Sequence, residues 1–138
     1  MKVAFCTSTG YEVDQSFGQA DSYTIWDIGP QESYYVHTVF APGRSSVRDD
    51  EIIARAEAIR DCAIVYSRDV NGPSIAKLVA RRIHPIKTNT NIRVEELINR
   101  LQDVFSGNMP PWLCKELLKT PWMLSDSNIW QKHRVDYG

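Results

Sequence analysis

The sequence lacks both a long apolar run and an excess of basic residues. Its 138 residues carry a formal net charge of −1. A nucleic-acid-binding domain normally carries a basic excess or a basic stripe, so we expect no nucleic-acid partner. No apolar stretch reaches the roughly 20 residues of a transmembrane helix, and no charged-then-apolar leader is recognisable at the start. We therefore expect a cytoplasmic protein that does not associate with a membrane.

Cysteine is also scarce. Cys6, Cys62 and Cys114 are odd in number and far apart, and they form no C-x-x-C pair. None of them has a zinc-type spacing to a histidine. This pattern favours three reduced thiols, at least one of them packed in the core. The alternative is that a single thiol supplies one ligand to a metal cluster.

Short apolar runs and amphipathic segments make up most of the chain. We expect strands near residues 2–6, 22–28, 33–40, 62–66 and 84–87, and helices over about 49–60, from 71–74 onward, and over about 91–105. The first strand is almost continuously apolar, which is typical of a strand buried on both faces. In the second helix, we expect Ile75, Leu78 and Val79 to form the inner face.

The order of these elements predicts an α/β fold. Three strands form an antiparallel meander, and two crossover units follow, which are right-handed almost without exception. The most economical arrangement is a five-stranded mixed sheet in the order 3-2-1-4-5, with helices on both faces. We expect residues 1–106 to form this domain.

Residues 107–138 have a different character. A short amphipathic helix is expected over Trp112–Leu118, and Trp122 and Trp130 follow without a clear period. This C-terminal helix and aromatic tail either packs on the domain or extends from it as a partner-binding segment.

Polar loops follow the first and fourth expected strands. In open α/β sheets, ligands bind outside the carboxyl ends of the strands where the strand order reverses. A helix N-terminus there offers free N–H donors to an anion. The candidate binding residues are Thr7, Ser8, Asp14, Ser16, Phe17, Gly18, Arg44, Asn71 and Gly72. Arg48 and Arg68 are also expected within reach in such a fold, although each of these arginines is more often a solvated surface charge.

No enzyme motif is present: the sequence has no P-loop, no G-x-S-x-G and no H-E-x-x-H. A two-metal nuclease site needs several carboxylates at strand ends. Asp14 and Asp69 could converge, but Asp27 is expected at the far end of the second strand. A Cys–His nucleophile pair is left open, with Cys6 a poor candidate because its strand is buried. We expect a protein that is not an enzyme.

The opening of the chain resembles a known family. Lys2-Val3-Ala4-Phe5, followed by Val13-Asp14-Gln15-Ser16-Phe17-Gly18, is similar to the start of the NifX/NafY group of nitrogenase cofactor carriers. The segment 59–67 looks like the family's D-C-x-A-V-Y strand, and Pro110-Pro111-Trp112-Leu113 resembles the W-L ending of NifX-type chains. The resemblance covers about residues 2–118. It implies a ribonuclease-H-like motif and the single-domain, NifX-like branch.

The resemblance also implies a function. Proteins of this group bind an iron-sulfur cofactor precursor (NifB cofactor) or the iron-molybdenum cofactor transiently, and hand it on during nitrogenase maturation. The implied partners are the cofactor-assembly scaffold or apo-nitrogenase, with the chain a monomer or a weak dimer. The alternative is an accessory module that docks on these partners without holding a cluster, through Trp112, Trp122 and Trp130.

One departure from the family concerns the ligand. The family usually has histidine before Phe-Gly, whereas this chain has Ser16. An imidazole is a good donor to iron, and a neutral hydroxyl is a weak one. Another residue could ligate instead; the candidates are Cys114, His37, Cys6 and His133. Otherwise backbone N–H groups and cations hold the cluster, or this member does not bind it.

Overall fold

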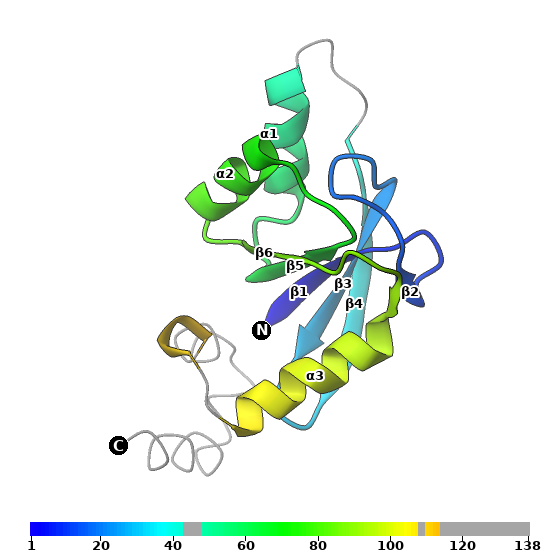
Figure 1. Cartoon of the computed structure of the whole chain (residues 1–138), viewed down its shortest axis with the longest axis vertical. Helices are drawn as coiled ribbons and strands as arrows, with labels where there is room; N and C mark the ends of the chain where they lie inside the picture. The colour runs from blue at the N-terminus through cyan, green and yellow to red at the C-terminus, as the bar shows by residue number, and fades with distance from the viewer. Residues whose placement is uncertain (43–47, 108–109, 114–138) are drawn as a thin grey trace.

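A five-stranded mixed sheet forms the middle layer of the fold (Figure 1). The computed structural model describes residues 1–42, 48–107 and 110–113. The strands are β1 (Lys2–Cys6), β3 (Ser22–Ile28), β4 (Ser33–Phe40), β5 (Ile64–Ser67) and β6 (His84–Lys87), in the order β4-β3-β1-β5-β6. Strand β1 pairs antiparallel with β3 and parallel with β5. This is the predicted strand order, and the α/β fold class is confirmed.

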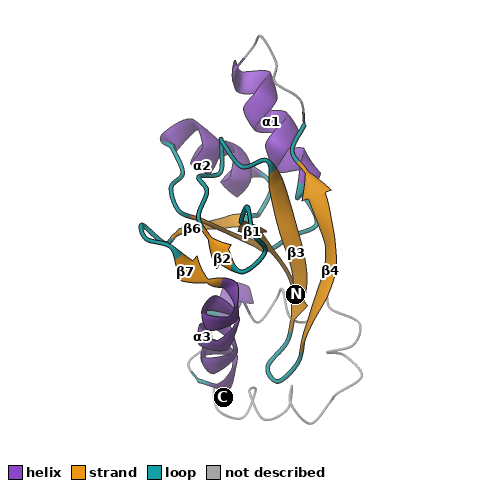
Figure 2. Cartoon of the chain, turned by 90° about the vertical axis from the view of Figure 1, so that its right-hand side faces the viewer, coloured by secondary structure: helices purple, strands orange, loops and turns teal. Residues whose placement is uncertain are grey.

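Helices cover both faces of the sheet. Helices α1 (Arg48–Ala58) and α2 (Gly72–Ala80) lie together on one face, and α3 (Val94–Ser106) lies on the other (Figures 1 and 2). Successive side chains of a strand point to opposite faces. Val3 and Phe5 of β1 therefore pack with the apolar side of α3, while Ala4 and Cys6 pack with α1 and α2. Strand β1 is buried on both faces, as predicted.

A second, two-stranded sheet lies beside the first and was not expected. Strand β2 (Glu12–Val13) pairs antiparallel with β7 (Ile92–Arg93). The third helix therefore begins at Val94 and not near residue 91, because Ile92 and Arg93 are used in this pairing. The Val94 N–H then donates to the Tyr11 carbonyl at 2.8 Å. This small sheet ties the loop after β1 to the start of α3.

The inner face of α2 also differs from the prediction. Ser74 and Leu78, one turn apart, are the buried residues of this helix. Val79 is 57% exposed and Ile75 is 38% exposed. Residues four apart in a helix share one face, and Ile75 and Val79 occupy the neighbouring stripe, which stays outside the packed layer.

The described part of the C-terminal region contacts the domain. Leu113 is buried in the same cluster as α3, and the Trp112 ring stacks on His84 with ring centroids 4.7 Å apart. The rest of the predicted Trp112–Leu118 helix lies outside the described residues, as do Trp122 and Trp130. Among the helices of the described ranges, none has the length and apolar character needed to cross a membrane.

Candidate functional site

A turn that carries Ser16 runs alongside the loop that follows β5. The Arg68 N–H donates to the Gln15 carbonyl at 3.0 Å, and the Phe17 N–H donates to the Asp69 carbonyl at 3.0 Å. Ser16 lies between these two bonds. The Asn89 N–H, after β6, donates in turn to the Arg68 carbonyl at 3.1 Å. The backbone at the carboxyl ends of β1, β5 and β6 is thus joined into one rim.

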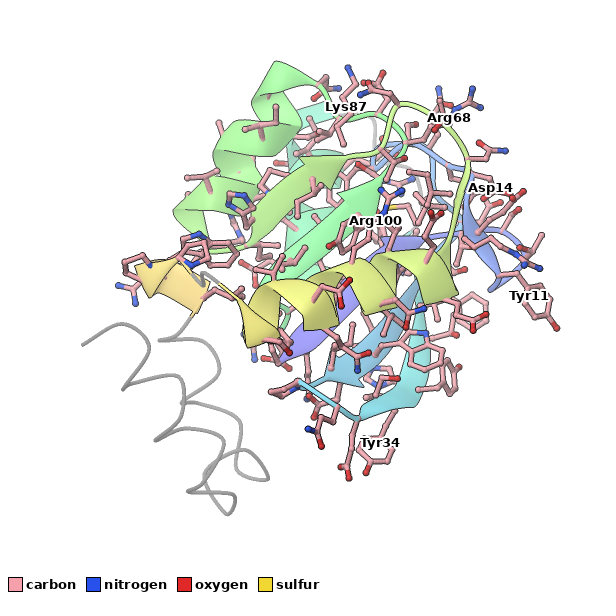
Figure 3. All side chains as sticks on the ribbon, turned by 60° about the horizontal axis from the view of Figure 1, so that its bottom comes forward. Tyr11, Asp14, Tyr34, Arg68, Lys87 and Arg100 are labelled. Carbon is pink, nitrogen blue, oxygen red and sulfur yellow. The ribbon has the colours of Figure 1, made fainter. Side chains whose placement is uncertain are left out.

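A cavity of about 560 Å³ opens in this rim. Its walls are Asp14, Gln15, Ser16, Gln19, Arg68, Asp69, Lys87 and Asn89. Figure 3 shows Asp14, Arg68 and Lys87 at the same end of the molecule. We call this the first cavity. The described residues of its walls include two carboxylates and two cations, and none of them has an apolar side chain.

The charges of the first cavity are partly paired. The Lys87 ammonium lies 3.2 Å from Asp69 Oδ1 and lowers the pKa of that carboxyl below its usual value. Asp14 accepts from the Ser8 N–H at 2.9 Å and from the Ser8 hydroxyl. Within the described ranges, Arg68 pairs with no carboxylate. Its exposed guanidinium is therefore the cation most available to an anionic ligand.

A second cavity, of about 850 Å³, adjoins the first and shares Ser16, Gln19 and Asp69 with it. Helices α1 and α2 supply its other side, with Arg55 and Glu51 from α1 and Ser74 from α2. Asn71, the N-cap of α2, also lines it and accepts from the Ser74 N–H at 2.9 Å. The Ser74 hydroxyl is buried and has no hydrogen-bond partner among the described residues. The two cavities meet at Ser16.

The family model described as dinitrogenase iron-molybdenum cofactor matches residues 1–104. The chain belongs to this family. The match includes every residue that lines the two cavities, and it confirms the resemblance to the NifX/NafY group.

Relatives of this family member include Protein NifX of Herbaspirillum seropedicae, which is 33% identical over 86% of this chain and 83% of that protein. Protein NifX of Azotobacter vinelandii is 29% identical over 87% of this chain and 77% of that protein. Protein NifY of Azotobacter vinelandii is 29% identical over 88% of this chain, but this chain spans only 50% of its length. These relatives support an accessory function in nitrogen fixation and iron-molybdenum cofactor biosynthesis.

A solved structure has the same fold as this family member. The crystal structure of PH0822 superposes with a TM-score of 0.61, covering 75% of this chain and 91% of the other. The sequence identity is 17%, so this likeness concerns the fold alone.

The structure brings several of the predicted binding residues together. Asp14, Ser16, Gly18 and Asn71 line the cavities, and Gly72 begins α2 directly after Asn71. These residues come from two loops and a helix N-terminus, as the switch-point argument predicts.

Other predicted residues act behind the walls. The buried Thr7 hydroxyl accepts from the Gly10 N–H at 2.9 Å and shapes the loop after β1. Ser8 holds Asp14, and the Phe17 ring is buried against Tyr23 with centroids 5.5 Å apart. Thr7, Ser8 and Phe17 therefore support the site without lining it. Arg44 lies outside the described residues.

The predicted metal ligands are not brought into either cavity. Cys6 is fully buried on the α1 side of β1, and burial raises the pKa of its thiol well above the ordinary range. His37 is exposed on β4 and lines neither cavity. Cys114 and His133 lie outside the described part of the chain. Among the described residues that line the cavities, none is a cysteine or a histidine.

The lining residues that were not predicted from the sequence include Gln19, Arg55, Lys87 and Asn89. Lys87 and Asn89 could have been predicted from their position in the sequence. Lys87 ends β6 and Asn89 follows it, and because β6 runs parallel to β5, both residues lie at the edge of the sheet where β5 ends. Arg55 carried no signal. It lies on α1 beside the apolar Ile52–Ala56–Ile59 stripe, and an arginine in that position is normally expected to be a solvated charge.

The carboxylates considered for a nuclease site do not all gather. Asp14 and Asp69 line the first cavity together, as predicted. Asp27 accepts from the N-terminal ammonium at 2.8 Å. It lies at the opposite end of the sheet, where it stands across from Lys2 in the antiparallel pairing of β1 and β3.

Proposed function

We propose that this protein binds an iron-sulfur cofactor precursor (NifB cofactor) or the iron-molybdenum cofactor and passes it on during nitrogenase maturation, without catalysing a reaction. The observation that carries the proposal is the family match over residues 1–104, which contain both cavities. The cargo site is the rim where the two cavities meet at Ser16.

The walls suit an anionic cargo that is held reversibly. Arg68 and Lys87 supply positive charge, and Asn71 places the N-terminal end of α2 beside the second cavity. Charge-assisted hydrogen bonds are about twice as strong as neutral ones. A thiolate or an imidazole would bind iron more firmly than these groups. Because the described residues of the rim include no cysteine or histidine, they favour temporary holding over permanent attachment.

The test is anaerobic mixing with isolated cofactor, followed by gel filtration and iron analysis of the protein peak. We expect iron to co-elute with the unaltered protein. Arg68→Gln, which removes the cation that pairs with no carboxylate among the described residues, should weaken binding about tenfold. Arg100→Gln is the matched control, because Arg100 extends from α3 and pairs with Glu96 at 3.0 Å, away from both cavities. No co-eluting iron at roughly tens of micromolar cofactor overturns the proposal.

The partners that we propose are the cofactor-assembly scaffold or apo-nitrogenase in the cytoplasm. This protein binds them as a monomer or a weak dimer. Strand β4, at the edge of the sheet, exposes Tyr34, Tyr35 and Phe40. Exposed aromatic side chains are common in protein interfaces. This observation also favours the second candidate function, a docking module that holds no cluster.

A pull-down separates the two functions. A docking module binds the scaffold or apo-nitrogenase in the absence of cofactor, and loses this binding when the chain is cut after Leu118. A carrier binds its partner more strongly after loading. Equal recovery of the partner with loaded and unloaded protein, together with no iron in the protein peak, favours the docking module.

A further inference from the structure

Helix α1 contains a buried arginine, Arg55, that lines the second cavity and also contacts the turn that carries Ser16. Arg55 is only 7% exposed, and arginine is rarely buried to this extent without partners. Its Nη1 donates to the Ala20 carbonyl at 2.7 Å, to the Tyr23 hydroxyl at 3.0 Å and to the Phe17 carbonyl at 3.4 Å. Its Nη2 lies 3.5 Å from Glu51 on the same helix. One guanidinium therefore joins α1 to both ends of the segment from Phe17 to Ala20.

The opposite side of this segment is bonded to the β5 loop. Phe17 donates its N–H to Asp69, while its carbonyl accepts from Arg55 and from the Tyr23 hydroxyl at 3.0 Å. The residues from Gln15 to Ala20 form no helix or strand of their own. Their position therefore depends on these bonds together with the burial of the Phe17 ring and of Ala20. Since Ser16 and Gln19 line both cavities, a shift of the turn would change the shape of both.

We propose that Arg55 is a positioning residue that sets the place of the turn from Gln15 to Ala20, and that cargo affinity depends on it. The second half of this inference rests on the proposed carrier function. Lysine cannot replace arginine fully here. A guanidinium presents five donors in a rigid planar fork, whereas an ammonium is a single point charge on a flexible stem. Ala20 and Tyr23 accept from Nη1 while Glu51 lies beside Nη2, so two nitrogens of the fork are in use, where a lysine has only one.

The first experiment needs no cargo. Amide hydrogen exchange is measured on the unloaded protein for Arg55→Met, Arg55→Lys and a control, Arg81→Met. Arg81, the C-cap of α2, is the matched control because it also contacts α1, through Glu57 at 2.8 Å, and its other side-chain hydrogen bond goes to Lys77 of its own helix and not to the turn. In Arg55→Met, the amides of Phe17, Gln19 and Arg68 should exchange at least about tenfold faster, relative to β1 and β5. Arg55→Lys should restore part of the protection.

A merely structural role for Arg55 gives a different pattern. If the role is merely structural, amide exchange in Arg55→Met becomes faster by the same factor in the turn and in the core strands, and this result overturns the inference. An unchanged exchange rate at the Phe17 amide also overturns it. Tyr23→Phe provides a second variant if Arg55→Met fails to fold. It removes one acceptor of Arg55 and one donor to Phe17, so the same amides should exchange faster by a smaller factor.

The second experiment adds isolated iron-molybdenum cofactor to the same variants under anaerobic conditions. We expect about tenfold weaker binding for Arg55→Met, an intermediate loss for Arg55→Lys and no loss for Arg81→Met. If the unaltered protein holds no iron, the carrier function fails, while the exchange result still decides whether Arg55 positions the turn. If it holds iron and Arg55→Met binds equally tightly despite a loosened turn, the link between Arg55 and affinity is wrong.

Discussion

Ser16 has a larger structural role than its small side chain suggests. It stands between the two backbone hydrogen bonds that join the turn to the β5 loop, and it belongs to the wall of both cavities. A larger side chain at this position would reach space that both cavities share. The Ser16 side chain therefore contributes to the chemistry of the rim, while backbone hydrogen bonds on either side hold the rim in place.

Replacing this serine by histidine tests where the cargo sits. We expect Ser16→His to strengthen cofactor binding about tenfold, which corresponds to ~1.4 kcal/mol, because imidazole is a better donor to iron than a neutral hydroxyl. Anaerobic titration with isolated cofactor measures the change. Ser16→Ala is the control and should leave the affinity almost unaltered. An unchanged affinity in the histidine variant would place the cluster elsewhere or show that another side chain already ligates it.

The cysteines should differ sharply in reactivity. Cys6 is fully buried, and burial together with the nearby Asp61 raises the pKa of Cys62 to about 12. The thiolate is the reactive form, so neither thiol should be alkylated in the native protein at pH 8. We expect Cys114 to be labelled first. Peptide mass mapping after alkylation measures this, and preferential labelling of Cys6 would contradict the burial of β1.

At the scale of elements, α2 couples one wall of the second cavity to the sheet. Its N-cap Asn71 has an extended backbone and accepts from the Ser74 N–H, and Pro73 stands in the first turn, where its missing N–H leaves no hydrogen bond unmade. Ser74 and Leu78 then anchor the helix by its buried face. The start of α2 is thus fixed by a side chain that also faces the cavity.

Loss of the cap should therefore weaken the helix measurably. We expect Asn71→Ala to lower the free energy of unfolding by about 1 kcal/mol, because one orphan N–H of the first turn loses its acceptor. Asn71→Ser, which keeps a capping oxygen, should recover most of this. The N-cap position of α3 offers a control, since Arg93 makes no side-chain cap there. Urea unfolding measures the free energy for Asn71→Ala, Asn71→Ser and the control Arg93→Ala. A loss in Asn71→Ser equal to that in Asn71→Ala would argue against capping.

At the scale of the whole molecule, the sequence predicted the sheet well because strand alternation and turn residues are local signals. The strands over 22–28, 33–40 and 84–87 were predicted with the bounds that the structure has. The β2–β7 pairing was missed because two residues carry no period, and only a contact between distant segments makes them strands.

The candidate site was predicted less completely, for a related reason. Loop position along the sheet edge indicated Asp14, Ser16 and Asn71. Arg55 could not be found in this way, since the contacts that join it to the turn are to the backbone carbonyls of Phe17 and Ala20. Every residue has a carbonyl, so no pattern of side chains marks these acceptors. Functional residues that act through backbone contacts emerge only from the folded structure.

Burial of several acidic groups predicts how the whole domain responds to alkaline pH. Burial raises the pKa of the Cys62 thiol and of the Tyr66 hydroxyl to about 12 each, and raises the pKa values of Cys6 and Tyr23 as well. Unfolded thiols titrate near pH 8.5 and unfolded tyrosines near pH 10. Above about pH 8.5 the unfolded chain therefore loses protons that the folded protein keeps, and the stability present at neutral pH is lost as pH rises toward the folded values.

The expected slope is ~1.4 kcal/mol per pH unit for each proton that the folded state retains and the unfolded state releases. Urea unfolding under reducing conditions at pH 7, 8, 9 and 10 measures it. Cys62→Ala should reduce the slope between pH 9 and 10 by about one proton, even if lost packing lowers the stability at pH 7. Because the comparison concerns slopes, the packing loss cancels. A free energy of unfolding that stays constant from pH 8 to 10 in the unaltered protein would contradict the burial of both thiols and, with it, the packing of α1 and α2 on this face of the sheet.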